Sequence, residues 1–108
     1  MASDYAWFCG NNPSLVYGAS PREVGRKLPN GFGLYDMAGG LEEWMSDGWG
    51  TCSSYAATDP YCPIINGFRM IKGGDWASQA YELGNSVSTY NDAGAGYSSS
   101  GFRVGITY

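Results

Sequence analysis

Apolar positions in this chain form short alternating runs, and no segment sustains a helical period beyond about two turns. In residues 102–106 the apolar side chains of Phe102, Val104 and Ile106 alternate with Arg103, Gly105 and Thr107 on either side. An alternation of period two is typical of a half-buried strand, so this run predicts a short strand near the C-terminus.

Two further runs have the composition of strands. Residues 68–72 end at a Gly-Gly pair, and residues 41–45 are expected to be extended. Residues 34–37 are instead expected to form one helical turn that ends at Gly39 and Gly40, because glycine readily adopts the left-handed conformation that ends helices.

The spacing of glycine and proline predicts a loop-rich fold. Seventeen glycines and five prolines divide the 108 residues into short pieces. Aromatic residues make up 16% of the chain, so a few large side chains can supply a core where aliphatic runs are scarce. We expect Trp44 and Trp76 to pack in that core.

Three motifs occur in order along the chain. GFGLYDMAGGLEEWMSD spans residues 31–47, IKGGDW spans residues 71–76, and GFRVGI spans residues 101–106. Together they resemble the C-terminal half of the formylglycine-generating enzyme (sulfatase-modifying factor) family. The resemblance implies an α+β, C-type-lectin-like fold with a small twisted antiparallel sheet and long ordered loops. It also implies that residues 1–108 form a single domain that lacks the N-terminal half of the family domain.

Composition excludes several classes of function. Six basic against ten acidic residues give a net charge of −4, which argues against a nucleic-acid partner. No apolar stretch is long enough to span a membrane, and residues 1–8 lack the features of a signal peptide. Histidine is absent, which excludes imidazole metal triads and Ser-His or Cys-His pairs.

The three cysteines show no spacing typical of a zinc site. Cys52 and Cys62 flank one loop, and a disulfide between them is one interpretation. The odd number of cysteines favours the other, in which the thiols are free.

The resemblance provides a test of catalytic activity. In the enzymes of this family a pair of cysteines, C-x-x-x-x-C, follows the G-G-S-[WY] motif and binds copper, and soft Cu(I) prefers thiolate ligands. In this chain Ser78 and Leu83 stand at those two positions, and Asp75 replaces the serine. We therefore expect no copper and no oxidase activity of the family type.

The resemblance also implies a calcium site around G-N-V-x-E-W. Glu43 aligns with the family glutamate, and Gly39 and Leu41 offer backbone carbonyls, which are hard oxygen ligands. Gly40 has lost the asparagine of the motif, and Glu42 replaces an aromatic residue. The alternative is that Glu42 and Glu43 are solvated charges or acceptors of hydrogen bonds from loops.

Residues 77–100 have the composition of a binding surface. Of these 24 residues, 18 are Ser, Tyr, Asn, Gly or Ala, as in antibody paratopes. Some proteins of the same fold are diversified by retroelements just before a terminal G-F-R-like motif. An ordinary polar loop is the alternative. The residues expected to contact a ligand are Trp76, Ser78, Gln79, Tyr81, Tyr90, Asn91 and Tyr97.

These observations favour a catalytically inactive module that recognises a protein or a glycan through the 77–100 face. Two alternatives remain open. The chain could be a structural subunit that completes its fold by pairing with itself or with another chain. It could also be an enzyme of another kind that uses the region of Glu43, Asp75 and Tyr81, although no paired acid and base supports this.

Overall fold

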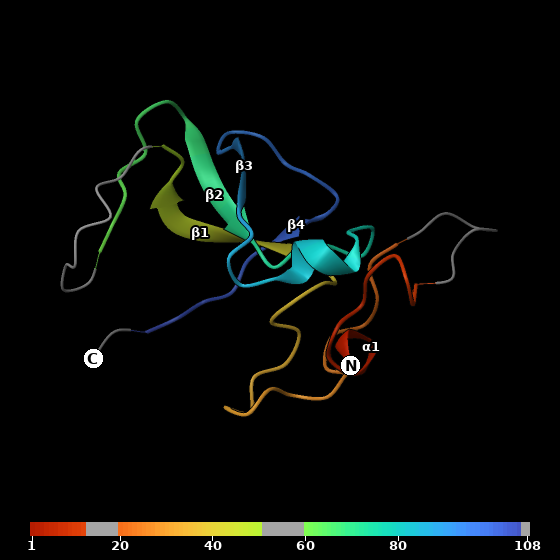
Figure 1. The fold of residues 1–108 in the computed structure, drawn as a ribbon. Coiled ribbons are helices and arrows are strands. Elements are labelled where there is room, and N and C mark those ends of the chain that lie inside the picture. The colour runs from red at the N-terminus through yellow and green to blue at the C-terminus, as the bar shows by residue number, and fades with distance from the viewer. Residues whose placement is uncertain (13–19, 51–59, 107–108) are drawn as a thin grey trace.

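The computed structural model describes residues 1–12, 20–50 and 60–106. Helix α1 spans Ala2–Tyr5, and a 3₁₀ helix, η1, spans Ala80–Leu83. The strands are β1 (Glu42–Gly48), β2 (Phe68–Lys72), β3 (Thr89–Asp92) and β4 (Ser100–Gly101). Figure 1 shows these short elements joined by long connections, as the spacing of glycine and proline predicts. Neither helix in this part of the chain is long and apolar enough to cross a membrane.

The four strands form one sheet in the order β3-β2-β1-β4. Strand β2 is antiparallel to both β1 and β3, whereas β4 runs parallel to β1. The α+β class is confirmed, but the sheet is mixed and not purely antiparallel. The reason is that the connection after β3 carries the chain across the sheet, so that β4 enters beside β1 in the same direction (Figure 1).

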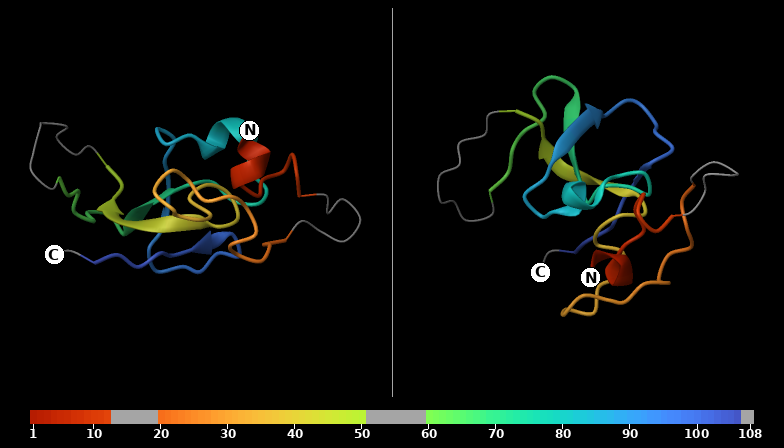
Figure 2. Two further views of the ribbon diagram at one scale, coloured as in Figure 1. Left: turned by 90° about the horizontal axis from the view of Figure 1, so that it is seen from below. Right: turned by 45° about the vertical axis from the view of Figure 1, so that its right-hand side comes forward.

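The strand predictions are confirmed for two of the three runs. Residues 68–72 form β2, and the extended segment expected at residues 41–45 falls largely within β1. The C-terminal prediction is wrong for residues 102–106, because β4 ends at Gly101 and the chain continues without a ladder partner among the described residues. Figure 2 shows this segment leaving the sheet toward the C-terminus.

The helical turn expected at residues 34–37 does not form. Asp36 has φ 54, which is a left-handed conformation and interrupts any right-handed turn. The backbone N–H of Gly25 donates to Asp36 Oδ2 at 2.7 Å, so a contact eleven residues away holds this conformation. Gly39 and Gly40 do adopt positive φ, as expected of glycines that end a segment.

Three distant segments are joined by backbone hydrogen bonds at one end of the sheet. The N–H of Gly40 donates to the carbonyl of Trp7 at 2.8 Å, and the N–H of Trp76 donates to the carbonyl of Gly40 at 2.9 Å. The N–H of Cys9 donates to the carbonyl of Ser78 at 3.0 Å. A side chain at residue 39 would collide with the backbone of Trp7, which explains a glycine there.

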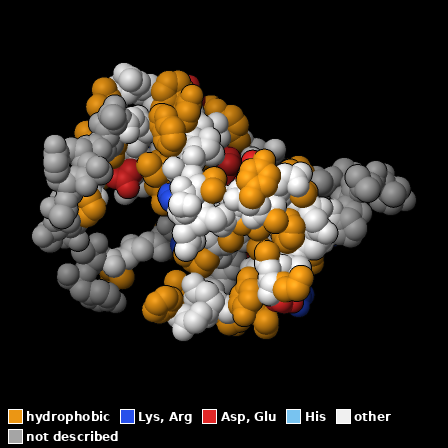
Figure 3. Space-filling model, in the orientation of Figure 1, with side chains coloured by type: hydrophobic (Ala, Val, Ile, Leu, Met, Phe, Trp, Pro, Cys, Tyr) orange, Lys and Arg blue, Asp and Glu red, His pale blue; other side chains and the backbone are white. Residues whose placement is uncertain are grey.

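The hydrophobic core of the described residues is small. Among the described residues only Ala6, Cys62 and Ile71 are buried and apolar, and Ile71 belongs to β2. Trp44 and Trp76, which were expected to be core residues, are only partly buried. Many large apolar side chains are exposed instead, and Figure 3 shows hydrophobic groups spread over the surface.

The cysteines differ in state. Cys62 is disulfide-bonded, whereas Cys9 is an exposed free thiol. The expectation of free thiols is therefore wrong for Cys62, which is buried beside the end of β1, where its carbonyl accepts from the N–H of Gly48. Cys52 lies outside the described residues.

Candidate functional site

One face of the sheet brings together side chains from three strands. Trp44 lies opposite Ile71, and Ile71 lies opposite Thr89, so these three residues form a row across β1, β2 and β3. Because side chains two residues apart in a strand point to the same face, Glu42 and Asn91 belong to this face too. We call this surface the Glu42 face.

The carboxylate of Glu42 is the centre of this face. Its Oε1 accepts hydrogen bonds from Ser100 Oγ at 2.7 Å, from Asn91 Nδ2 at 3.3 Å and from Ser99 Oγ at 3.4 Å. The N–H of Glu42 also donates to the carbonyl of Ser99 at 2.9 Å. Asn91 in β3 and the Ser99–Ser100 pair at the start of β4 are therefore both held against β1.

The environment of Glu42 disfavours its charge. Burial raises its pKa above 4.5, the hydrogen bond from Ser100 opposes this change, and the negative charge of Asp75 adds to it. Beside the carboxylate lies a cavity of about 190 Å³, which is also lined by Ser78, Glu82 and Thr89. The cavity is smaller than the 300 Å³ or so that usually encloses a whole small ligand. It suits one side chain or one sugar substituent of a larger partner.

The sequence left Glu42 as either a solvated charge or an acceptor of hydrogen bonds from loops, and the second interpretation is confirmed by the bonds from Ser99 and Ser100. Its place at the centre of a face of the sheet was missed. The signal was present in the alternation of β1. Residues 42 and 44 share a face, so a glutamate two positions before a tryptophan lies on the same side of the sheet. Its hydrogen-bond donors could not be predicted, because they lie 49, 57 and 58 residues away in the sequence.

Ser78 and Leu83, the two positions that the resemblance assigns to the family thiolates, both lie beside Gly74. A Cβ atom placed on Gly74 would lie 2.9 Å from Leu83 Cδ2 and 3.2 Å from Ser78 Oγ. Ser78 Oγ donates to Asp75 Oδ1 and accepts from the N–H of Asp75, both at 3.0 Å. Thus Ser78 is engaged in a local turn, and Leu83 offers no metal ligand.

Within residues 1–12, 20–50 and 60–106 no group of three or more His, Cys, Asp or Glu side chains could hold a metal ion. The glutamate expected to bind calcium is engaged elsewhere. Glu43 Oε1 and Oε2 both accept from Arg103, at distances between 2.8 and 3.1 Å.

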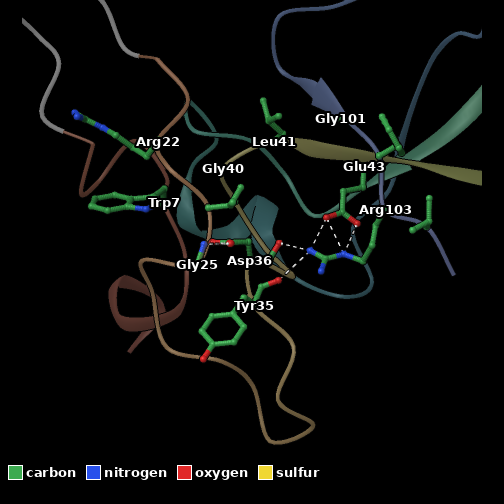
Figure 4. Close-up of a pocket in the computed structure, with 14 residues that line it drawn as sticks. Trp7, Arg22, Gly25, Tyr35, Asp36, Gly40, Leu41, Glu43, Gly101 and Arg103 are labelled. Carbon is green, nitrogen blue, oxygen red and sulfur yellow. Dashed lines mark hydrogen bonds and ion pairs between the residues drawn. The ribbon is translucent and has the colours of Figure 1, made fainter.

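Arg103 joins three parts of the chain on the opposite side of β1. Besides Glu43, its Nη2 donates to the carbonyls of Tyr35 at 2.9 Å and Asp36 at 3.1 Å (Figure 4). The hydrogen bond to Glu43 raises the pKa of Arg103 further, so it stays charged. Together these contacts lie beside a cavity of about 530 Å³, which is also lined by Leu41 and Phe102. Arg103 therefore ties the loop of residues 35 and 36 to β1 while remaining 37% exposed.

The remaining predicted ligand contacts fall on different sides of the molecule. Tyr97, 40% exposed, lies with its ring 6.4 Å from that of Trp44 on the Glu42 face. Tyr90, 44% exposed, stacks on Trp49 at 4.8 Å and meets Phe68 edge-on at 5.2 Å. Since adjacent residues of a strand point to opposite faces, Tyr90 and Asn91 cannot contact one ligand from the same face.

Three predicted residues lie around η1. Tyr81 is 76% exposed, the most accessible of the tyrosines in the segment. Gln79 precedes the helix and donates its backbone N–H to Glu82 Oε2 at 2.6 Å. The indole nitrogen of Trp76 is buried, and no described residue forms a hydrogen bond with it. Residues 79 and 81 are next to the Glu42 face in the chain, because Glu82 of η1 lines the cavity beside Glu42.

Fold and motifs together define a sulfatase-modifying-factor-like domain. The chain belongs to this family, because the model of the sulfatase-modifying factor enzyme 1-like domain matches residues 5–107. The formylglycine-generating enzyme of Mus musculus is 34% identical over 79 residues, which are 69% of this chain and 21% of that protein. Serine/threonine-protein kinase pkn1 of Chlamydia pneumoniae is 37% identical over 79 residues, 69% of this chain and 13% of that protein.

A solved structure has the same fold. Treponema denticola variable protein 1 superposes with a TM-score of 0.78 at 30% identity, over 93% of this chain and 35% of that chain. The chain thus spans between an eighth and about a third of the length of these three similar proteins.

Proposed function

We propose that this domain is a non-catalytic binding module that recognises a protein or a glycan through the Glu42 face and the surrounding residues of the 77–100 segment. The observation that carries the proposal is the convergence of Ser78 and Leu83 beside Gly74. Both side chains border Gly74, and neither a hydroxyl nor an isobutyl group can bind Cu(I) as a thiolate does. In this proposal the domain keeps the Glu42 face as a binding surface and lacks a copper centre.

The construction of the segment supports recognition. Asn91, Ser99 and Ser100 hold the segment to Glu42, whereas Tyr81 and Tyr97 present their rings to solvent. Tyrosine offers a large amphipathic contact area at a low cost in conformational entropy. A rigid frame with exposed aromatic groups reduces the entropy lost on binding, because the surface is already ordered.

The acidic side chains in and around residues 77–100 favour a partner that donates hydrogen bonds. Residues 77–100 contain Glu82 and Asp92 but neither lysine nor arginine. Glu42 and Asp75 add further carboxylates, and neither forms an ion pair with a described residue. Hydroxyl or amide donors of a glycan or a protein surface would be accepted by these oxygens, whereas an anionic surface would be repelled.

The structural neighbour supports a diversified role. That protein is called a variable protein, and it has the fold of this chain over 93% of the residues. By analogy we propose that exposed positions of the 77–100 segment vary in sequence while the residues that bind Glu42 stay constant. The same division of a scaffold and a variable surface is found in antibody binding sites.

The test is a screen of glycan and cell-surface protein arrays, followed by three single variants. Tyr81→Ala and Tyr97→Ala are each expected to weaken binding by about 2 kcal/mol, as is typical of aromatic hot spots. Tyr90→Ala is the matched control, because Tyr90 has nearly the exposure of Tyr97 but lies on the other face of the sheet. All three proteins must first show a cooperative melt.

The control separates the outcomes. Binding that is lost in Tyr90→Ala and retained in Tyr97→Ala would place recognition on the opposite face. Equal binding by all three variants would remove the 77–100 segment from the recognition surface.

A further inference from the structure

Two asparagines of the chain begin the same short sequence. Asn30 and Asn66 are each followed by glycine and then by phenylalanine. Glycine has no Cβ, so the backbone nitrogen that follows each asparagine is accessible. That nitrogen can attack the amide carbon of the asparagine side chain, and both positions therefore have the sequence of a deamidation site. The two sites differ in their surroundings.

The side chain of Asn30 is held by its own loop. Its Oδ1 accepts hydrogen bonds from the N–H of Phe32 at 2.9 Å and from the N–H of Leu34 at 3.0 Å. The backbone of Asn30 is held as well, because its N–H donates to the carbonyl of Leu34 and its carbonyl accepts from the N–H of Gly33, both at 2.9 Å. Turning this side chain toward the nitrogen of Gly31 requires that these bonds break.

Asn66 and Gly67 have no such contacts. Both residues are exposed and precede β2, which begins at Phe68. In the described ranges the side chain of Asn66 forms no hydrogen bond, and the N–H of Gly67 donates none. Gly67 has φ 75, and a Cβ atom placed on it would meet no atom within 4 Å beyond its chain neighbours. Figure 1 shows the loop that leads into β2 at the outer edge of the molecule.

The other asparagines are held by hydrogen bonds or are followed by a larger residue. Three donate side-chain hydrogen bonds to carbonyl or carboxylate oxygens, namely Asn11, Asn12 and Asn91. Asn85 is exposed, and its side chain forms no hydrogen bond with a described residue. It precedes Ser86, however, whose Cβ crowds the backbone nitrogen. Among the described residues Asn66 alone combines an unheld side chain with a following glycine.

We propose that Asn66 is a site of spontaneous deamidation, and that the fold protects Asn30 from the same reaction. The backbone nitrogen of Gly67 gives up its proton to water and attacks Cγ of Asn66. The N–Cγ bond forms, the Cγ–Nδ2 bond breaks, and ammonia leaves after it takes up a proton from water. A water molecule then opens the cyclic imide at either carbonyl carbon, which gives aspartate or isoaspartate. Water is the only other reactant.

The products change the chain at the start of β2. Each adds a negative charge to a chain of net charge −4. Isoaspartate also inserts an extra carbon into the main chain just before Gly67, whose carbonyl accepts from the N–H of Ala93 at 2.8 Å. We expect the isoaspartate form to lose this hydrogen bond, which lowers the melting temperature by about 5 °C in a domain of this size.

The first experiment follows the masses of peptides from folded protein that has been kept in mildly alkaline buffer, which helps remove the amide proton. Cleavage after aromatic residues places Asn30, Asn66 and Asn85 on separate peptides. Asn66 should deamidate about tenfold or more faster than Asn30, because Asn30 must first release two hydrogen bonds. Asn85 should also react more slowly than Asn66, since serine follows it.

The same measurement in urea is the matched control. Asn30 and Asn66 share the sequence Asn-Gly-Phe, so their rates should become similar once the chain is unfolded.

A second experiment uses Asn66→Gln, a change at an exposed side chain without hydrogen bonds to described residues. The longer side chain closes a ring much more slowly. Anion exchange should therefore show the added charge in aged wild type but not in aged Asn66→Gln, and the melting temperature of the variant should not fall with time.

Three results would each overturn the proposal. They are an Asn66 peptide that deamidates no faster than the Asn30 peptide in folded protein, a difference between these two sites that persists unchanged in urea, and an Asn66→Gln protein that acquires the added charge as fast as wild type.

Discussion

Replacing Arg103 by alanine tests how the terminal motif holds the fold together. The change removes five donor contacts, three to the carboxylate of Glu43 and two to the carbonyls of Tyr35 and Asp36. No other described side chain joins β1 to the loop of residues 35 and 36 in this way (Figure 4). We therefore expect both elements to lose a shared constraint.

The magnitude follows from the exposure of the pair. Hydrogen bonds to charged groups contribute about 1.5 to 3 kcal/mol when protected, but exposed ion pairs contribute about 1 kcal/mol or less. Arg103 is 37% and Glu43 is 19% exposed, so the pair lies between these limits. We expect Arg103→Ala to cost about 2 kcal/mol in the free energy of unfolding. For 108 residues this lowers the melting temperature by about 9 °C.

The assay is thermal unfolding of Arg103→Ala, Arg103→Lys, Glu43→Gln and the double variant Arg103→Ala/Glu43→Gln. Lysine retains the charge but not the planar fork, so it should recover less than half of the loss. The double-mutant cycle should give a coupling free energy of about 1 kcal/mol. A melting temperature of Arg103→Ala within about 1 °C of wild type, or a coupling free energy near zero, would refute this reasoning.

Three further predictions concern the sites that the sequence suggested. First, the wild-type protein should form no formylglycine in a C-x-P-x-R peptide in the presence of Cu(I) and oxygen, and measurable product would contradict this expectation. The double variant Ser78→Cys/Leu83→Cys should gain affinity for Cu(I), because both positions lie beside Gly74. Second, because Arg103 engages both carboxylate oxygens of Glu43, calcium should leave the melting temperature of wild type unchanged; a rise in wild type that is absent in Glu43→Gln would contradict this and support the calcium site that the family resemblance implies. Third, burial raises the pKa of Glu42 above 4.5, so its contribution to stability is present below that pH and is lost as the pH rises through the raised value. In urea melts Glu42→Gln should therefore gain stability relative to wild type as the pH rises above about 4.5, and a difference that stays constant with pH would contradict the assignment.

Local sequence patterns predicted the local structure well. The run at residues 68–72 forms β2, the Gly-Gly pair after it adopts positive φ, and the segment after Gly40 is extended. Each of these features depends on residues that are adjacent in the sequence. The α+β class and the family followed from the order of the motifs.

Features that depend on distant contacts could not be predicted. The conformation of Asp36 is held by the N–H of Gly25, so a turn that looks helical by composition is not helical. An alternating run forms a ladder only where a neighbouring strand is available, and residues 102–106 lack one in the described ranges. The face to which Tyr90 points depends on its register with Met70, which composition does not reveal. For the same reason Glu42 could not be recognised as the centre of a hydrogen-bond network.

The most direct test of the central claim is a scan of all single substitutions at residues 77–100, displayed on cells and sorted for folded protein. If the segment is a recognition surface on a constant frame, positions that hold Glu42 should tolerate few changes, above all Asn91 and Ser100. Exposed positions such as Gln79, Tyr81 and Tyr97 should tolerate most side chains, with effects within about 0.5 kcal/mol for polar replacements. If all positions tolerated substitution equally, or if Tyr81 tolerated as few substitutions as Ser100, the division of the segment into a constant frame and a recognition surface would be contradicted.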